Sequence, residues 1–138
     1  MILFNYETDY RLNSEDEIKQ WISKCIVIRE FEEGELNYIF CNDTYLHKLN
    51  VEFLKHDDYT DIISFDYSIG KRISCDIFIS VERVRENAKE FTQKLDNELH
   101  RVIIHGVLHC MGYKDKGKKE KEIMRAEENA CLNLLNSK

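Results

Sequence analysis

Apolar and polar residues follow two different periods along this chain, and the changes of period divide it into successive segments. Alternating or short apolar runs predict strands at residues 2–6, 35–42, 60–65 and 73–80. Apolar residues spaced by three and four predict helices that start near residues 15 and 43, over 81–91, over 99–111, and from about 118. The order β-α-β-α-β-β-α-α-α predicts an α+β domain, in which a small mixed sheet of about four strands packs against helices.

Polar residues at the segment boundaries predict where the helices begin. Ser14, followed three residues later by Glu17, has the pattern of a capping box. Asp43 is placed to cap the short helix after the second strand, and Gly70 predicts the turn between the last two strands. The inward positions of the last helix are predicted to be Ile123, Met124, Ala130, Cys131, Leu134 and Leu135.

The composition is typical of a soluble globular protein. The 138 residues suit a single domain spanning 1–138, with 43% apolar residues, 33% charged residues, no proline and no repeat. No apolar run approaches the ~20 residues needed to span a bilayer, and Met1 leads directly into the first predicted strand without a signal segment. Five scattered cysteines without a CxxC pair favour reduced thiols in the cytoplasm.

The helix over 99–111 carries the candidate chemistry. It is apolar on almost every face, which predicts burial in the middle of the domain, yet it contains His105 and His109. Histidines four residues apart differ by about 40° around a helix, so both rings leave the same face and can bind one metal ion. Gly112 is suited to end the helix and turn the chain, so that Asp115 returns toward the rings. Two imidazoles and a carboxylate predict one catalytic Zn²⁺ per chain, with a fourth position for water.

Other interpretations of these residues remain open. Histidines at this spacing also occur by chance, and His56 is an alternative third ligand. Cys110 adjoins His109 but lies about 100° away around the helix, which disfavours it as a ligand. An HExxH metalloprotease has a glutamate base after its first histidine, whereas this chain has Gly106.

Each of two further groups of polar residues has a functional interpretation and a structural alternative. Asp61 and Asp76 lie in otherwise apolar predicted strands, so each is either an edge residue or, with Thr60 and Ser64, a hydrogen-bonding partner of the metal ligands. The net charge of −6 requires any contact with nucleic-acid phosphates to be local. Lysines crowd behind the glycine turn and are either RNA contacts or an ordinary solvated surface: Lys114, Lys116, Lys118, Lys119 and Lys121.

Several separated motifs together resemble the YbeY family of metal-dependent endoribonucleases, also called the rRNA maturation factor family. The family helix H-G-x-L-H-x-x-G-Y stands here at 105–113. Three further family patterns have counterparts upstream. Leu-Asn is found at 49–50, Thr-Asp-Val-Leu-Ser-Phe is matched by Thr-Asp-Ile-Ile-Ser-Phe at 60–65, and Asp-Ile-x-Ile-Ser is found at 76–80. Three positions depart from the family pattern: Asp115 replaces the third ligand histidine, Leu54 replaces an arginine implied in RNA contact or catalysis, and Cys75 replaces a glycine.

The resemblance implies a single-strand-specific, zinc-dependent endoribonuclease that acts in 16S rRNA 3′-end maturation and ribosome quality control. Zinc-bound water, held through His105, His109 and Asp115, would attack the phosphodiester. The implied partners are ribosomal RNA and the small ribosomal subunit or its proteins, with no DNA and no membrane. The alternative is a non-catalytic ribosome-assembly module in which zinc only braces the fold, and a peptide hydrolase is disfavoured by Gly106.

Overall fold

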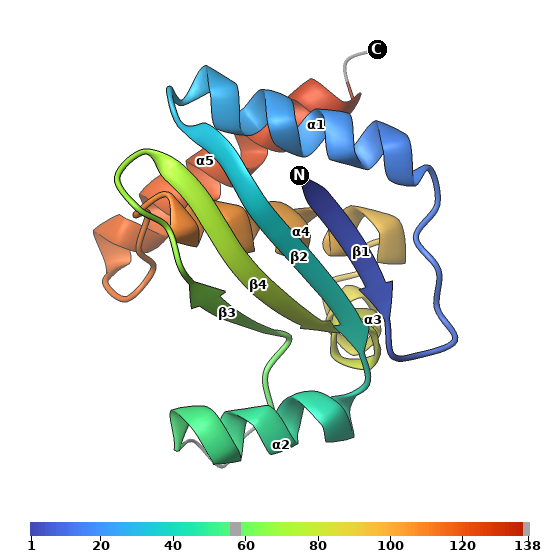
Figure 1. Ribbon diagram of the computed structural model, residues 1–138. Coiled ribbons are helices and arrows are strands. Elements are labelled where there is room, and N and C mark those ends of the chain that lie inside the picture. Colours follow the sequence, from blue (N-terminus) through green and yellow to red (C-terminus); the bar gives the residue numbers. More distant parts are fainter. Residues whose placement is uncertain (56–58, 137–138) are drawn as a thin grey trace.

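Four strands form a single sheet in the order β1-β2-β4-β3 (Figure 1). The computed structural model describes residues 1–55 and 59–136. The strands are β1 (Ile2–Tyr6), β2 (Glu32–Cys41), β3 (Ile62–Asp66) and β4 (Arg72–Ser80). β1, β2 and β4 run parallel, whereas β3 is antiparallel to β4 and joined to it through a turn in which Gly70 has φ +58°. The predicted four-stranded mixed sheet of an α+β domain is therefore confirmed.

Five helices complete the described part of the chain, in the predicted order. They are α1 (Glu15–Ile28), α2 (Asp43–Leu54), α3 (Val81–Glu90), α4 (Leu95–Cys110) and α5 (Lys118–Asn136). Within the described residues, no helix is both long and apolar enough to cross a membrane. All five cysteines are free and buried.

The predicted starts of α1 and α2 are confirmed, whereas the predicted side-chain caps at these starts are wrong. Ser14 precedes α1 in the left-handed conformation, with φ 57°, and its side chain makes no capping hydrogen bond. At α2, Asn42 is the N-cap, and its side-chain oxygen accepts a hydrogen bond from the Tyr45 N–H. Asp43 lies one residue too late for this role and instead accepts hydrogen bonds from Ser80 and Arg83. Both N-caps thus depend on backbone angles that the residue types alone do not determine.

The core lies between the sheet and the helices α1 and α4, which cover one of its faces (Figure 1). α4 approaches β3 and β4 so closely that a Cβ atom built on Gly106 would lie 3.0 Å from Ile62 Cδ1 and 3.1 Å from Ile77 Cδ1. On the outside, α5 packs against α4 and α1, and the Trp21 indole N–H donates to the Cys131 carbonyl at 2.6 Å. The histidine-bearing helix is therefore central, as expected from its apolar faces.

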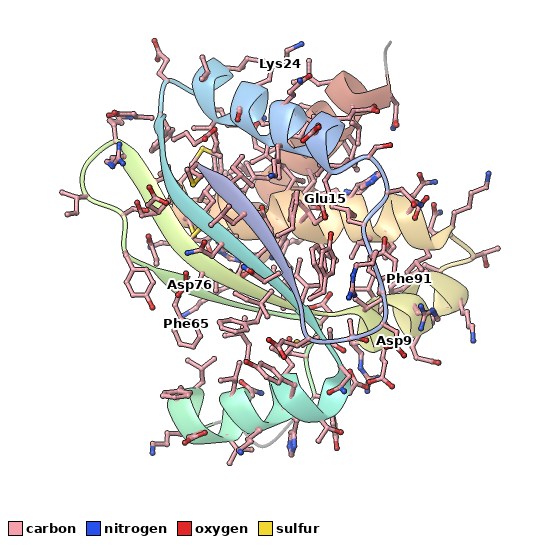
Figure 2. The ribbon with its side chains drawn as sticks, turned by 45° about the vertical axis from the view of Figure 1, so that its right-hand side comes forward. Asp9, Glu15, Lys24, Phe65, Asp76 and Phe91 are labelled. Atoms are coloured by element: carbon pink, nitrogen blue, oxygen red, sulfur yellow. The ribbon has the colours of Figure 1, made fainter. Side chains whose placement is uncertain are left out.

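The opposite face of the sheet packs against α2. There Leu46 and Cys41 join Ile63 in a small second apolar cluster, together with half-buried Phe65 and Phe78. Figure 2 shows Phe65 and Asp76 on this side of the sheet. The Asp76 carboxylate accepts a hydrogen bond from the Asn37 side-chain amide at 3.0 Å.

The inward stripe of α5 differs from the predicted one at two positions. Met124, Cys131 and Leu135 are buried as predicted, whereas Ile123 is 47% exposed and Ala130 is exposed. The buried positions follow spacings of four, three and four, and the residue between Met124 and Cys131 in that series is Glu128. Ile123 and Ala130 each lie one residue, about 100°, away from this stripe.

Candidate metal centre

α4 places two imidazoles side by side at its C-terminal end. The ring centroids of His105 and His109 are 4.5 Å apart, and the ring planes are at 82°. From Val102 to Cys110 the other residues of the helix, such as Ile104 and Leu108, are buried, and within this stretch His105 and His109 are the partly exposed positions. The predicted arrangement, two histidines on one face of a buried helix, is confirmed.

The end of α4 turns the chain back over the histidines. Gly112 has φ +100°, a conformation that glycine adopts without steric cost. Its N–H donates to the His109 carbonyl at 3.0 Å, and the Tyr113 N–H donates to the Leu108 carbonyl at 3.1 Å. This pair of bonds is a Schellman motif. The loop that follows brings Asp115 Oδ2 to 3.3 Å from Nε2 of both His105 and His109.

These three side chains fit a tetrahedral metal ion. One ligand atom from each of His105, His109 and Asp115 lies within 4.8 Å of the others. For metal–ligand distances of about 2.0 Å, tetrahedral geometry places any two ligand atoms about 3.3 Å apart. Both distances from the Asp115 carboxylate to the imidazole nitrogens have this value. Two imidazoles and one carboxylate are a donor set that zinc accepts, with a fourth position left for water or substrate.

Glu128 of α5 orients His105 and was not identified from the sequence. The residue is 5% exposed, and its carboxylate lies 2.7 Å from His105 Nδ1 and 2.8 Å from the guanidinium of Arg101. A carboxylate at Nδ1 keeps the proton on that nitrogen, which leaves the lone pair of Nε2 for a metal. The sequence signal that could have identified Glu128 is its position as an acidic residue within the apolar stripe of the last helix.

Burial and pairing oppose each other in the pKa values of these two groups. Burial lowers the pKa of His105, but the hydrogen bond and negative charge of Glu128 outweigh it, and the pKa is raised above its ordinary value. For Glu128, burial raises the pKa, whereas the hydrogen bonds from His105 and Arg101 lower it by more, so the net shift is downward. Glu128 is thus held as a carboxylate beside the candidate metal ligands.

The four polar residues of the β3 and β4 segments separate into different environments. Asp61 lines a pocket of about 290 Å³ together with His105, Asp115 and Glu128, and burial raises its pKa while His105 lowers it. Ser64 pairs with Ile77 in the sheet and so shares the face that packs against α4. The Thr60 hydroxyl donates to the Ile62 carbonyl at 3.4 Å. Asp76 lies on the opposite face, away from the histidines.

The other residues singled out from the sequence lie around the centre or outside it. Cys110 is buried and takes no part in the ligand cluster, and His56 falls outside the described residues. The five lysines are exposed: Lys114 and Lys116 in the loop, and Lys118, Lys119 and Lys121 at the start of α5. Leu54 ends α2 with 41% of its surface exposed, and Cys75 is buried in β4.

The fold and the centre together define a small α+β protein with a His–His–Asp site suited to a divalent metal ion. Residues 3–136 match the family model described as Endoribonuclease YbeY. The chain belongs to this family.

Curated relatives match over nearly the full length. The chain is 57% identical over 135 residues to an Endoribonuclease YbeY of Flavobacterium johnsoniae, covering 98% of this chain and 97% of the relative. It is 50% identical over 138 residues to the protein of the same name from Flavobacterium psychrophilum, covering 100% and 99%. The solution structure of TM1509 from Thermotoga maritima has the same fold, with a TM-score of 0.69 at 23% identity, covering 98% of this chain and 89% of the other.

Proposed function

We propose that this protein is a zinc-dependent endoribonuclease that cleaves single-stranded RNA in the maturation of ribosomal RNA. The observation that carries the proposal is the placement of Asp115 Oδ2 at 3.3 Å from both histidine Nε2 atoms. The names of the curated relatives support ribonuclease activity. The family resemblance further supports a role in 16S rRNA 3′-end processing and ribosome quality control in the cytoplasm.

The chain's own residues would divide the chemistry as follows. His105, His109 and Asp115 would hold zinc, which supplies a Lewis acid for a phosphoryl oxygen and lowers the pKa of water. Glu128 fixes the tautomer and orientation of His105 through the 2.7 Å contact at Nδ1. Gly106 provides no side-chain base, and its close contact with Ile62 and Ile77 leaves no space for one. The centre therefore suits phosphodiesters better than the peptide hydrolysis of HExxH enzymes.

The charge distribution favours a substrate presented by a larger particle. The chain carries a net charge of −6, so free RNA is repelled except near the basic residues that follow α4. Binding to isolated RNA should be weak and strongly salt-dependent, and the small ribosomal subunit would supply most of the specificity. The lysines at 114, 116, 118, 119 and 121 are the proposed phosphate contacts from the loop and α5.

The test compares wild type with His109→Ala, prepared identically, on end-labelled single-stranded RNA and on small-subunit precursor particles. Circular dichroism first establishes that both proteins are folded. We expect slow cleavage by the zinc-loaded wild type at low salt and none by His109→Ala. Equal cleavage by the two proteins would attribute the activity to a contaminating nuclease and refute the proposal.

A second function has support from the acidic surroundings of the centre. Four carboxylates, Asp61, Glu98, Asp115 and Glu128, line the pocket against two guanidiniums. Such a site could brace the fold of a non-catalytic ribosome-assembly module. This function is indicated if wild type and His109→Ala both bind the precursor particle and neither cleaves either RNA.

A further inference from the structure

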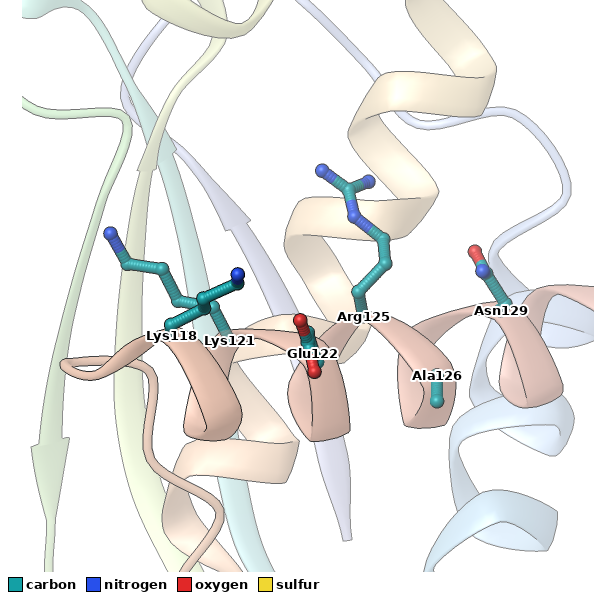
Figure 3. Close-up of a pocket in the computed structure, with 6 residues that line it drawn as sticks. All are labelled: Lys118, Lys121, Glu122, Arg125, Ala126 and Asn129. Carbon is teal, nitrogen blue, oxygen red and sulfur yellow. The ribbon is translucent and has the colours of Figure 1, made fainter.

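Arg125 of α5 lies where three hollows of the surface meet. It lines the metal pocket of about 290 Å³, a shallow hollow beside Lys118 and Lys121, and a groove of about 680 Å³ between α4 and α5. Figure 3 shows its guanidinium projecting from α5 toward α4, with the two lysines nearer the start of the helix. One residue thus borders the metal centre, the basic end of α5 and the groove.

The guanidiniums of Arg101 and Arg125 differ in how far their charge is already neutralised. Arg101 donates to Glu128 at 2.8 Å and to Asn129 at 2.9 Å, and its side chain is 23% exposed. Among the residues that the structure describes, the carboxylate oxygen nearest to Arg125 belongs to Glu128 and is 3.9 Å away, and the Arg125 side chain is 64% exposed. Arg101 therefore maintains the internal network, while Arg125 can turn its donors to a ligand.

The negative charges that line the metal pocket make a cation at its edge favourable for binding an anion. The lining carries four carboxylates and only these two guanidiniums, so a polyanion that enters meets repulsion near the histidines. A planar guanidinium can bind two phosphate oxygens at once, which a lysine ammonium cannot do in the same geometry. Arg125 is positioned to bind a phosphate as the strand passes from the lysines to the centre.

Beyond Arg125 the groove changes in chemical character. It shares Glu98, Arg101 and Arg125 with the metal pocket, so the two hollows adjoin. Its other lining includes the side-chain amides of Gln93, Asn97, Asn129, Asn133 and Asn136. Phe91, with 60% of its surface exposed, stands at the groove as well. Uncharged amides pair with base edges, and an exposed ring offers a stacking surface, so this lining suits a nucleobase.

We propose that single-stranded RNA crosses α5 at Arg125, which binds a phosphate beside the metal pocket, and that the adjoining nucleotide places its base in the amide-lined groove between α4 and α5. This inference rests on the proposed ribonuclease function and specifies where the strand lies. Arg125 acts here as a binding and positioning residue.

The experiment measures binding of a fluorescein-labelled ten-nucleotide oligouridylate by anisotropy, with metal-free protein in EDTA, over a series of salt concentrations. Arg125→Ala should weaken binding about tenfold at low salt and reduce the slope of log K against log salt by about 0.7, the value for one lost contact to a single strand. Arg125→Lys should restore the slope. Asn133→Leu should weaken binding without changing the slope, because it removes no phosphate contact.

Arg85→Ala is the matched control, because it removes the same side chain from an exposed position on α3 that lines none of the three hollows. Competition with a chromophoric chelator should give equal zinc affinity for wild type and Arg125→Ala. If Arg125→Ala lowers the midpoint temperature of unfolding, the binding measurement is repeated with Arg125→Gln, which keeps more of the side chain.

The outcomes separate this inference from the function on which it rests. One outcome is that the wild type cleaves RNA while Arg125→Ala and Arg85→Ala have equal slopes of log K against log salt. That outcome would overturn the proposed path of the strand and leave the ribonuclease function standing. Asn133→Leu binding equal to wild type would overturn the base site. A wild type that neither binds nor cleaves RNA would refute both.

Discussion

Replacement of Glu128 by glutamine tests whether the carboxylate on α5 determines the metal affinity of a site to which it contributes no ligand. The carboxylate joins two donors, the His105 ring at 2.7 Å and Arg101 at 2.8 Å, and is 5% exposed. An amide of the same shape keeps one acceptor oxygen but must present its NH₂ group to the other donor. The His105 ring then loses either its fixed orientation or the charge that favours its Nδ1–H tautomer.

The Glu128→Gln substitution should lower both the zinc affinity and the free energy of unfolding. Loss of such a carboxylate partner to a metal-bound histidine costs about 10- to 100-fold in metal affinity, or about 1.4 to 2.7 kcal/mol. In the metal-free protein, the loss of a hydrogen bond to a charged group lowers the free energy of unfolding by about 1.5 to 3 kcal/mol. Arg101 keeps its 2.9 Å bond to Asn129, which places the expected loss toward the lower end.

Zinc affinity is measured by competition with a chromophoric chelator, and the free energy of unfolding by urea denaturation in EDTA. Glu127→Gln is the control, because it makes the same change at the next residue, whose carboxylate pairs with Arg29 and lies outside the metal centre. We expect Glu127→Gln to retain wild-type zinc affinity. Equal zinc affinities for wild type and Glu128→Gln would show that the orientation of His105 does not depend on Glu128.

Three further predictions follow from other parts of the centre and its support. Asp115→Ala should weaken zinc binding, so that elemental analysis finds less than one zinc per chain, whereas Asp115→His should retain it; one zinc per chain in both variants would exclude Asp115 as a ligand. Gly106→Ala should lower the free energy of unfolding by about 1 to 3 kcal/mol, because the new methyl group overlaps Ile62 Cδ1 at 3.0 Å. Addition of Ile62→Val removes that methyl and should restore part of the loss, and no restoration in urea denaturation would place the strain elsewhere. Burial lowers the pKa of His100 below its ordinary value of 6.5, so the unfolded chain binds this proton more readily and the folded state loses stability as the pH falls below that value. The free energy of unfolding of His100→Phe should therefore rise relative to wild type as the pH falls from about 7 to about 5, and a pH-independent difference would contradict this.

The sequence predicted most of the fold because the periodicity of each segment matches the burial that it has in the structure. The alternation in β4 reflects a strand with one buried face, and the apolar residues of α4 reflect a helix that is buried on most sides. Both patterns are local properties of the sequence. The order of the strands in the sheet is not local, and it follows from contacts such as those of β1 with β2, which are separated by all of α1. The capping bond predicted at Ser14 is absent for a related reason, since Ser14 has a left-handed backbone, with φ 57°, that its residue type does not predict.

The proximity of the three candidate ligands was predictable for the same reason, whereas the carboxylate that contacts His105 was not. His105, His109 and Asp115 lie within eleven residues, joined by a helix and a glycine turn whose geometries are known in advance. Glu128 reaches His105 only because α5 packs back along α4, which is a tertiary contact. Asp61 and Asp76 had equal standing in the sequence. They separate because Asp61 precedes β3 and lines the pocket with His105, whereas Asp76 lies within β4, paired with Phe65 on the face that packs against α2.

The tie between Trp21 of α1 and the Cys131 carbonyl of α5 joins segments that are 110 residues apart. The same helix α5 carries Glu128, whose carboxylate lies 2.7 Å from His105 Nδ1. A change that loosens α5 from α1 would therefore also displace the partner of His105. The geometry of the candidate centre thus depends on the docking of a helix that contributes none of the three candidate ligands.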